Sequence, residues 1–194
     1  MIPEQLKFSK KRLNIILAYT KNKRFMGYKN DLPWKRLLQA DMNYIKLLTT
    51  MQGKVAILMG KNTFKSIPKP FTNRLNIVLS RSELFENDNV ITFSELDDAI
   101  KYCKDNGYYC VIFGGSKIYG ETFKYPHRLY STIIEDKDFE GDTVMPCCDT
   151  PVNNISDIVD GFLTANDIKK TWVCENNEFT ENGIKFTFNI GDKF

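Results

Sequence analysis

The chain has 194 residues, 42% of them hydrophobic, and its 27 basic and 24 acidic residues give a formal net charge of +3. A chain of this length can bury one sizeable core, so a single domain is expected. The nearly balanced charge argues against the strongly basic surface of a protein that binds nucleic acid or a membrane. A mildly basic pocket for a small molecule remains compatible with this composition.

Cysteine usage and the start of the chain bear on the compartment. The five cysteines are odd in number, none has C-x-x-C spacing, and His127 is the only histidine. This pattern predicts neither a disulfide framework nor a metal site. Residues 1–12 lack the apolar run of a signal peptide, and no stretch reaches the roughly 18 apolar residues of a membrane span. We expect a cytoplasmic protein with an N-terminal extension at residues 1–12 and one domain at residues 13–194.

Short apolar runs separated by helical patterns dominate the first two thirds of the chain. Such runs are typical of strands buried on both faces of a sheet. Residues 41–48 and 95–104 have helical periodicity, with a capping pattern at residues 94–97 and a stop at Gly107. The alternation predicts a single α/β domain whose mostly parallel, twisted sheet of about eight strands is flanked by helices. The expected strands are residues 13–19, 55–59, 75–79, 109–113 and 129–134.

Residues 149–194 have a different pattern. Residues 171–175 and 184–190 alternate apolar with polar side chains and are separated by the turn-rich residues 176–183. This pattern predicts an antiparallel hairpin at an edge of the sheet. Residues 149–170 are polar and weakly periodic, so we expect a loop there, with at most a short helix.

One acidic residue interrupts the apolar face of the first predicted helix. Leu37, Asp41, Tyr44, Ile45 and Leu48 share one helical face. A carboxylate that faces a core is costly unless a partner binds it, so Asp41 is a candidate for ligand recognition. The alternative is a hydrated aspartate in the first turn of a helix, where the macrodipole favours an acid.

Two strand-to-helix corners carry residues suited to phosphate groups. At Gly114 and Gly115, backbone amides can approach phosphate oxygens closely. At the second corner Lys61 follows Gly60, and Arg81 follows the next strand, which adds two cations. Neither corner is specific by itself, because a turn without a ligand and solvated surface cations explain them as well.

Arg74 is a candidate for binding a carboxylate. It lies beside Phe71 and Asn73, and its guanidinium could grip a ligand carboxylate with two hydrogen bonds. A lone arginine is more often an ordinary surface residue. The absence of a second histidine and of a serine or cysteine elbow argues against a hydrolytic triad.

The chain carries, in this order, Leu32-Pro33-Trp34, Asp41, residues 59–64, residues 74–81, residues 114–119, Thr132 and residues 140–143. Taken together, these motifs resemble dihydrofolate reductase, and the resemblance covers about residues 13–190. It implies transfer of a hydride from NADPH to 7,8-dihydrofolate, giving 5,6,7,8-tetrahydrofolate, by a monomeric cytoplasmic enzyme that antifolates inhibit.

The resemblance assigns four residues to the reaction. Asp41, with a pKa raised by burial, would orient the pterin and favour its protonation. Thr132 would hydrogen-bond Asp41, and Trp34 would anchor an ordered water nearby. Leu32 would close over the nicotinamide as part of a mobile loop at residues 23–34, which excludes water during the transfer.

The resemblance also assigns two binding slots. Gly114 and Gly115 would be joined by a cis peptide bond, and Arg74 would hold the glutamate carboxylate. The substrate slot would comprise Ile16, Ala18, Asp41, Met42, Ile45, Ile67, Phe71, Arg74, Phe113 and Tyr119. The NADPH slot would comprise Ala18, Met26, Gly27, Gly60, Lys61, Thr63, Ser80, Arg81, Gly114, Gly115, Ser116, Lys117, Ile118 and Tyr119, with Lys61, Ser80 and Arg81 on the 2′-phosphate.

Three positions depart from the family's pattern. Ile45 replaces a phenylalanine over the pterin and benzoyl rings, Phe64 replaces a tryptophan, and Asn73 replaces a turn glycine while tolerating the same left-handed backbone.

Three other functions stay open: a riboflavin-pathway pyrimidine reductase of the same fold, a non-catalytic NADPH- or folate-binding module, and the reductase half of a fusion with thymidylate synthase.

Overall fold

The computed structural model describes residues 1–194, in which ten strands form one sheet. In chain order the elements are η1 (Glu4–Leu6), β1 (Leu13–Thr20), β2 (Phe25–Gly27), α1 (Gln39–Thr50), β3 (Val55–Gly60), α2 (Lys61–Ser66), β4 (Leu75–Leu79), β5 (Val90–Phe93), α3 (Leu96–Asp105), β6 (Tyr109–Ile112), α4 (Ser116–Thr122), β7 (His127–Ile134), β8 (Thr143–Val144), β9 (Asn153–Asn154), α5 (Ser156–Thr164), β10 (Val173–Glu175), β11 (Glu178–Glu181) and β12 (Ile184–Lys193).

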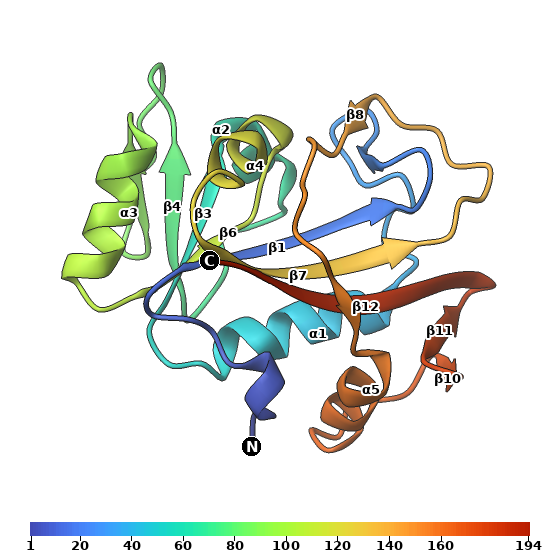
Figure 1. Ribbon diagram of the computed structural model, residues 1–194. Coiled ribbons are helices and arrows are strands. Elements are labelled where there is room, and N and C mark those ends of the chain that lie inside the picture. The colour runs from blue at the N-terminus through green and yellow to red at the C-terminus, as the bar shows by residue number, and fades with distance from the viewer.

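The sheet has a parallel centre and an antiparallel edge. Its order is β10-β11-β12-β7-β1-β6-β3-β4-β5, with β9 paired to β12 and with β2 and β8 forming a separate two-stranded sheet (Figure 1). All pairings from β7 through β5 are parallel, whereas β9 to β12 add antiparallel pairings. The predicted α/β class is therefore confirmed, and the sheet has ten strands instead of about eight.

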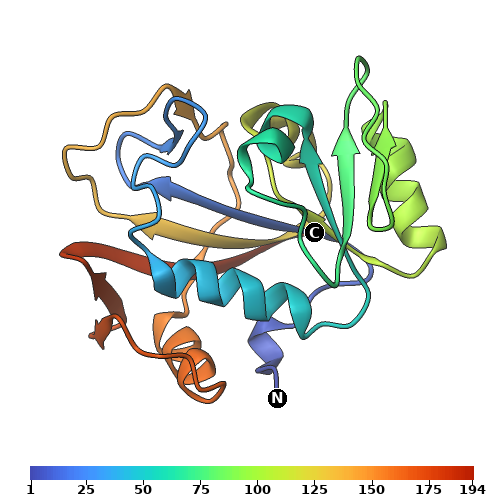
Figure 2. The same cartoon turned by 180° about the vertical axis from the view of Figure 1, so that it is seen from behind.

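Buried side chains form one core on each face of the sheet. Ile16 and Ile57 belong to a cluster shared with α1 and α5, whereas their neighbours Ile15 and Leu58 belong to a cluster shared with α3 and α4. Because successive strand side chains point to opposite faces, a strand covered on both faces must be apolar at nearly every position. Figure 2 shows α1 running across the first of these faces.

The central elements lie where the sequence predicts them. All five predicted strands form, and β7 begins at His127, two residues earlier than expected. Gly107, with φ of +72°, follows α3 as predicted. The capping pattern predicted at residues 94–97 is wrong, because the residue before α3 is Glu95 and no side-chain cap hydrogen bond forms; Glu95 pairs with Arg81 instead. Leu37 lies outside α1 and is 44% exposed, so it is not part of the buried helical face.

The C-terminal region contains more structure than the sequence predicts. Residues 176–183 contain β11, so the region has two tight hairpins instead of one. The first turn, at Asn176 and Asn177, and the second, at Asn182 and Gly183, have φ values between +51° and +67°. Asparagine and glycine favour such two-residue turns. Residues 149–170 contain β9 and the nine-residue α5, whose Val159, Phe162 and Leu163 are buried.

The segment before β1 packs against the domain. Leu6 and Phe8 are buried, the Phe8 N–H donates to Gln52 Oε1 at 3.0 Å, and Gln52 Nε2 donates to the Leu6 carbonyl at 2.8 Å. These contacts join η1 to the segment that follows α1.

The longest helix, α1, has 12 residues, and none of the helices could span a membrane.

Candidate active site

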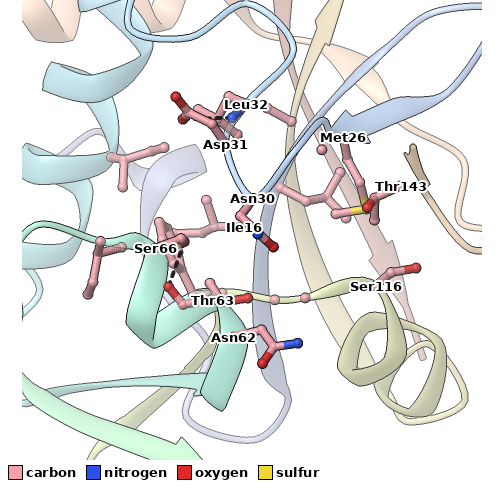
Figure 3. A pocket seen from close by; sticks show the side chains of 18 of the residues that line it. Ile16, Met26, Asn30, Asp31, Leu32, Asn62, Thr63, Ser66, Ser116 and Thr143 are labelled. Atoms are coloured by element: carbon pink, nitrogen blue, oxygen red, sulfur yellow. Dashed lines mark hydrogen bonds between the residues drawn. The ribbon is translucent and has the colours of Figure 1, made fainter. Parts of the chain in front are cut away.

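A cavity of about 1020 Å³ opens at the carboxyl ends of β1, β3 and β6. Ligands of open α/β sheets bind at this edge. Figure 3 shows Asn62, Thr63 and Ser66 of α2 on one side of the cavity, with Asn30 to Leu32 of the loop after β2 facing it. The predicted site residues that line the cavity are Ile16, Ala18, Met26, Gly27, Leu32, Asp41, Met42, Ile45, Lys61, Thr63, Ile67, Phe71, Arg74, Phe113, Gly114, Gly115, Ser116, Lys117, Ile118 and Tyr119.

Asp41 is the only buried acid in the cavity wall. It is 3% exposed, whereas the other acids of the wall, Asp31 and Asp142, are not buried. The pKa of Asp41 is raised to about 6; burial is the largest cause, and the nearby carboxylate of Glu181 acts in the same direction. The Thr132 hydroxyl donates to Asp41 Oδ1 at 2.6 Å and lowers the pKa. The alternative of a hydrated helix-start aspartate is therefore wrong.

Two predicted residues support the cavity from behind. Thr132 lies on β7 and reaches the cavity only through Asp41. Trp34 is 1% exposed and packs edge-on against Phe139 in the core, with ring centroids 6.4 Å apart. Neither side chain lines the cavity, so each can act on a ligand only through another group.

Arg74 is held rigidly at one end of the cavity. Its Nη1 donates to Thr49 Oγ1 at 2.7 Å, its Nε donates to the Thr72 carbonyl at 2.9 Å, and its guanidinium lies 5.1 Å from the centre of the Phe71 ring. Burial lowers its pKa, but the group stays charged because an arginine pKa lies so far above neutrality. A fixed, half-buried guanidinium is suited to a carboxylate.

The glycine corner lies between β6 and α4. Gly114 and Gly115 are joined by a cis peptide bond, as the family resemblance implies. Gly114 has φ of +107°, and a Cβ there would lie 3.2 Å from the Tyr119 ring. The Tyr119 hydroxyl donates to the Ile16 carbonyl at 2.6 Å, which fixes that ring. The close contact with the ring and the positive φ both require glycine at position 114.

The second corner lies partly outside the cavity. Lys61 lines the cavity, and its Nζ donates to Ser82 Oγ at 2.8 Å, so the segment after β4 is adjacent. Ser80 and Arg81 do not line the cavity: Ser80 Oγ accepts the Glu83 N–H, and Arg81 is exposed and paired with Glu95 at 2.9 Å. Gly60 also lies behind the wall, where its N–H donates to the Gly114 carbonyl at 2.8 Å.

Sequence reasoning missed a contact that holds the loop over the cavity. The Lys29 N–H donates to Asp142 Oδ2 at 2.8 Å, and Asp142 and Thr143 line the cavity beside Gly27. The motif at residues 140–143 marked this region, but no local signal connected it with the loop. Other wall residues without a predicted role include Asn30, Arg36, Lys46 and Lys69.

Comparison with known proteins identifies the family. A family model described as dihydrofolate reductase matches residues 12–188. The chain belongs to the dihydrofolate reductase family. The dihydrofolate reductase of Bacillus subtilis (strain 168) is 37% identical over 134 residues, which are 69% of this chain and 75% of the relative. That of Haemophilus influenzae is 35% identical over 133 residues, or 69% and 78%.

A solved structure supports the same family. The Schistosoma mansoni dihydrofolate reductase has a TM-score of 0.71 and 30% sequence identity, and the match covers 93% of this chain and 97% of that one. Membership of the dihydrofolate reductase family makes the chain an oxidoreductase that reduces dihydrofolate to tetrahydrofolate with a nucleotide cofactor. A pyrimidine reductase of the same fold and a non-catalytic module are not favoured.

The departures from the dihydrofolate reductase pattern have clear places in the structure. Asn73 has φ of +60°, so it adopts the left-handed backbone that was expected of it. Phe64 packs edge-on against Phe85, with ring centroids 5.1 Å apart. Ile45 lines the cavity on the same helix as Asp41, so it leaves an aliphatic wall where the family has an aromatic one.

Proposed function

We propose that this enzyme uses NADPH to reduce 7,8-dihydrofolate to 5,6,7,8-tetrahydrofolate, with Asp41 as the residue that orients the substrate. The observation that carries the proposal is the burial of Asp41 in the wall of the cavity, with its Oδ1 already bonded to Thr132. A pterin presents a ring nitrogen and an amino group side by side as hydrogen-bond donors, and one carboxylate can accept both hydrogen bonds.

The other half of the cavity has the donors that a nicotinamide dinucleotide phosphate requires. Gly114 brings backbone next to the cavity, and the hydroxyls of Thr63 and Ser116 and the cation of Lys117 suit phosphate oxygens. Lys61 stands at the outer end, near the segment of Ser80 and Arg81, where it suits a 2′-phosphate. This chemistry fits NADPH, which when bound supplies the hydride.

The residues around the substrate have different roles. Asp41 binds the pterin and, when ionised, stabilises positive charge on it, so a proton that arrives from water is retained on the ring. Apolar side chains, among them Ile16, Ile45 and Phe113, hold the flat rings and exclude water. Arg74 binds the carboxylate of the glutamate tail.

The loop after β2 would control solvent access. The hydrogen bond from the Lys29 N–H to Asp142 holds this loop against the residues before β8. Leu32, which belongs to the loop, lines the cavity. Closure of Leu32 over the nicotinamide excludes water during the transfer. We further propose a monomeric cytoplasmic enzyme, and antifolates as ligands of the same slot.

An absorbance assay with NADPH and dihydrofolate tests the reaction. We expect turnover by the wild type, and for Asp41→Asn a loss of kcat/KM of about 10²-fold or more at pH 7, because a neutral amide cannot stabilise the protonated pterin. Part of the rate should return at low pH, where the substrate is already protonated. Asp98→Asn, on the exposed side of α3, is the matched control. Full activity of Asp41→Asn would remove Asp41 from the reaction.

The cofactor preference has a separate test. The ratio of kcat/KM for NADPH to that for NADH should fall roughly tenfold or more in Lys61→Ala, because a charge-assisted hydrogen bond to the 2′-phosphate is lost. The rate with NADH should change little, since NADH lacks that phosphate. An equal loss with both nucleotides would place Lys61 elsewhere in the mechanism.

A further inference from the structure

A second buried carboxylate lies behind Asp41, at the end of the C-terminal strand β11. Glu181 is 1% exposed. Its Oε2 accepts the Ala40 N–H at 3.0 Å, and its Oε1 accepts the Thr171 hydroxyl. None of the ion pairs of the chain involves Glu181. A buried carboxylate without a cation is costly and calls for an explanation.

The hairpin that carries Glu181 makes two hydrogen bonds to residues at the start of α1. Ala40 is the second residue of α1 and precedes Asp41 directly, and Asn182 Nδ2 donates to the Leu37 carbonyl at 2.7 Å. The carboxylate therefore faces the positive end of the helix dipole, which accounts for part of its stabilisation. A glutamine could make both hydrogen bonds of Glu181, to the Ala40 N–H and to the Thr171 hydroxyl. These two hydrogen bonds therefore do not by themselves account for a charge at this position.

We propose that Glu181 is a positioning residue for the reductase reaction, which fixes the first turn of α1 through Ala40 and makes the electrostatic potential at Asp41 more negative. This proposal rests on the proposed function of Asp41. A more negative potential at the pterin site favours the protonated form of the bound substrate. The hairpin thus acts on the chemistry without contacting the cavity.

The surroundings of Asp41 leave Glu181 as the one charged group acting on it. Thr132 faces Asp41 from β7 with a neutral hydroxyl. Tyr44 of α1 is close to Asp41, and Tyr130 of β7 is close to Tyr44, but burial raises the pKa of both phenols, so they stay neutral. Glu181 raises the pKa of Asp41, so removal of its charge must lower that pKa.

Glu181→Gln removes the charge of Glu181 but can keep its two hydrogen bonds. The glutamine carbonyl can accept the Ala40 N–H, and the Thr171 hydroxyl can accept from the amide where it now donates. In a pH profile of kcat/KM, we expect the high-pH limb to move to lower pH. The rate above the midpoint should fall roughly twofold or more while the low-pH plateau is kept. Glu178→Gln, a partly exposed carboxylate on the same strand paired with Lys185, should leave the midpoint in place.

Glu181→Asp provides the complementary variant. It keeps the charge but shortens the side chain, so the contact with the Ala40 N–H is lost. We expect a midpoint close to that of the wild type together with a lower kcat/KM. A midpoint that moves as far as in Glu181→Gln, or a kcat/KM equal to that of the wild type, would overturn the proposal.

A titration of the free protein distinguishes this proposal from the proposed function. Carboxyl ¹³C shifts report the pKa of Asp41 without any turnover, with Asp41→Asn identifying its resonance. We expect the pKa of Asp41 to be lower in Glu181→Gln than in the wild type. An active wild type whose Asp41 pKa and rate profile are both unchanged by Glu181→Gln would overturn the role of Glu181. A wild type that titrates as expected but does not reduce dihydrofolate would instead overturn the proposed function.

Discussion

Replacing Asp41 with asparagine should stabilise the protein while it removes activity. The pKa of Asp41 is about 6 in the folded protein, compared with an ordinary value of 3.8. The folded state therefore binds more protons than the unfolded state between these values, so stability falls as the pH rises through this window. The difference of about 2.2 units, at 1.36 kcal/mol each, makes the cost of ionising Asp41 about 3 kcal/mol above pH 6.

The expected result is a stability difference that depends on pH. Because asparagine carries no charge to bury, the free energy of unfolding of Asp41→Asn relative to the wild type should increase by about 2.4 kcal/mol between pH 4 and pH 8, since part of the total is already lost at pH 4, where the unfolded aspartate is more than half ionised. Urea unfolding at several pH values measures this difference, and Asp98→Asn, which removes an exposed aspartate, is the control. A difference that is the same at pH 4 and pH 8 would refute the argument that Asp41 is ionised at the expense of stability.

Three further substitutions test the walls of the cavity. Arg74→Lys should raise KM for dihydrofolate about tenfold with little change in kcat, because the two-pronged contact is lost; an equal effect on a pterin without the glutamate tail would contradict it. Gly114→Ala places a Cβ 3.2 Å from the Tyr119 ring at a φ of +107°, and should destabilise the fold by about 1–3 kcal/mol in urea unfolding and raise the Kd for NADPH in calorimetry. An unchanged Kd would show that the corner does not contact the cofactor. Ile45→Phe should tighten binding of folate analogues by about 0.5–1.5 kcal/mol in the same measurement, whereas weaker binding would show that no aromatic ring fits there.

Local patterns were sufficient for the framework of the fold. The apolar runs that became β1, β3, β4, β6 and β7 were recognisable because both faces of the sheet are covered, which leaves no polar alternation in those strands. The same patterns missed β11, because its four residues lie between two asparagine-rich turns and resemble one long turn. They left α5 almost unmarked, since Asp157, Asp160 and Gly161 dilute its apolar stripe.

For the site, the sequence identified residue types but not their environment. Asp41 stood out as a misfit on a helix, yet a hydrated first-turn acid was an equally good interpretation until its burial was known. The sequence likewise marked Lys61 and Arg81 as equivalent cations, but Lys61 lines the cavity and Arg81 lies outside it. Position along the chain cannot distinguish such cases, because solvent exposure is set by what packs above a residue.

By itself the sequence determined the five central strands β1, β3, β4, β6 and β7, the helix that carries Asp41, the two strand-to-helix corners and the family resemblance, since each depends on the order of neighbouring residues. Only the tertiary structure decided the electrostatic state of Asp41. Its two modifiers, Thr132 and Glu181, are 91 residues from it and 141 residues from its neighbour Ala40 in the chain, and are brought close by β7 and β11. The pKa of a buried carboxyl depends on distance through space and on the exclusion of water, which are properties of the folded chain.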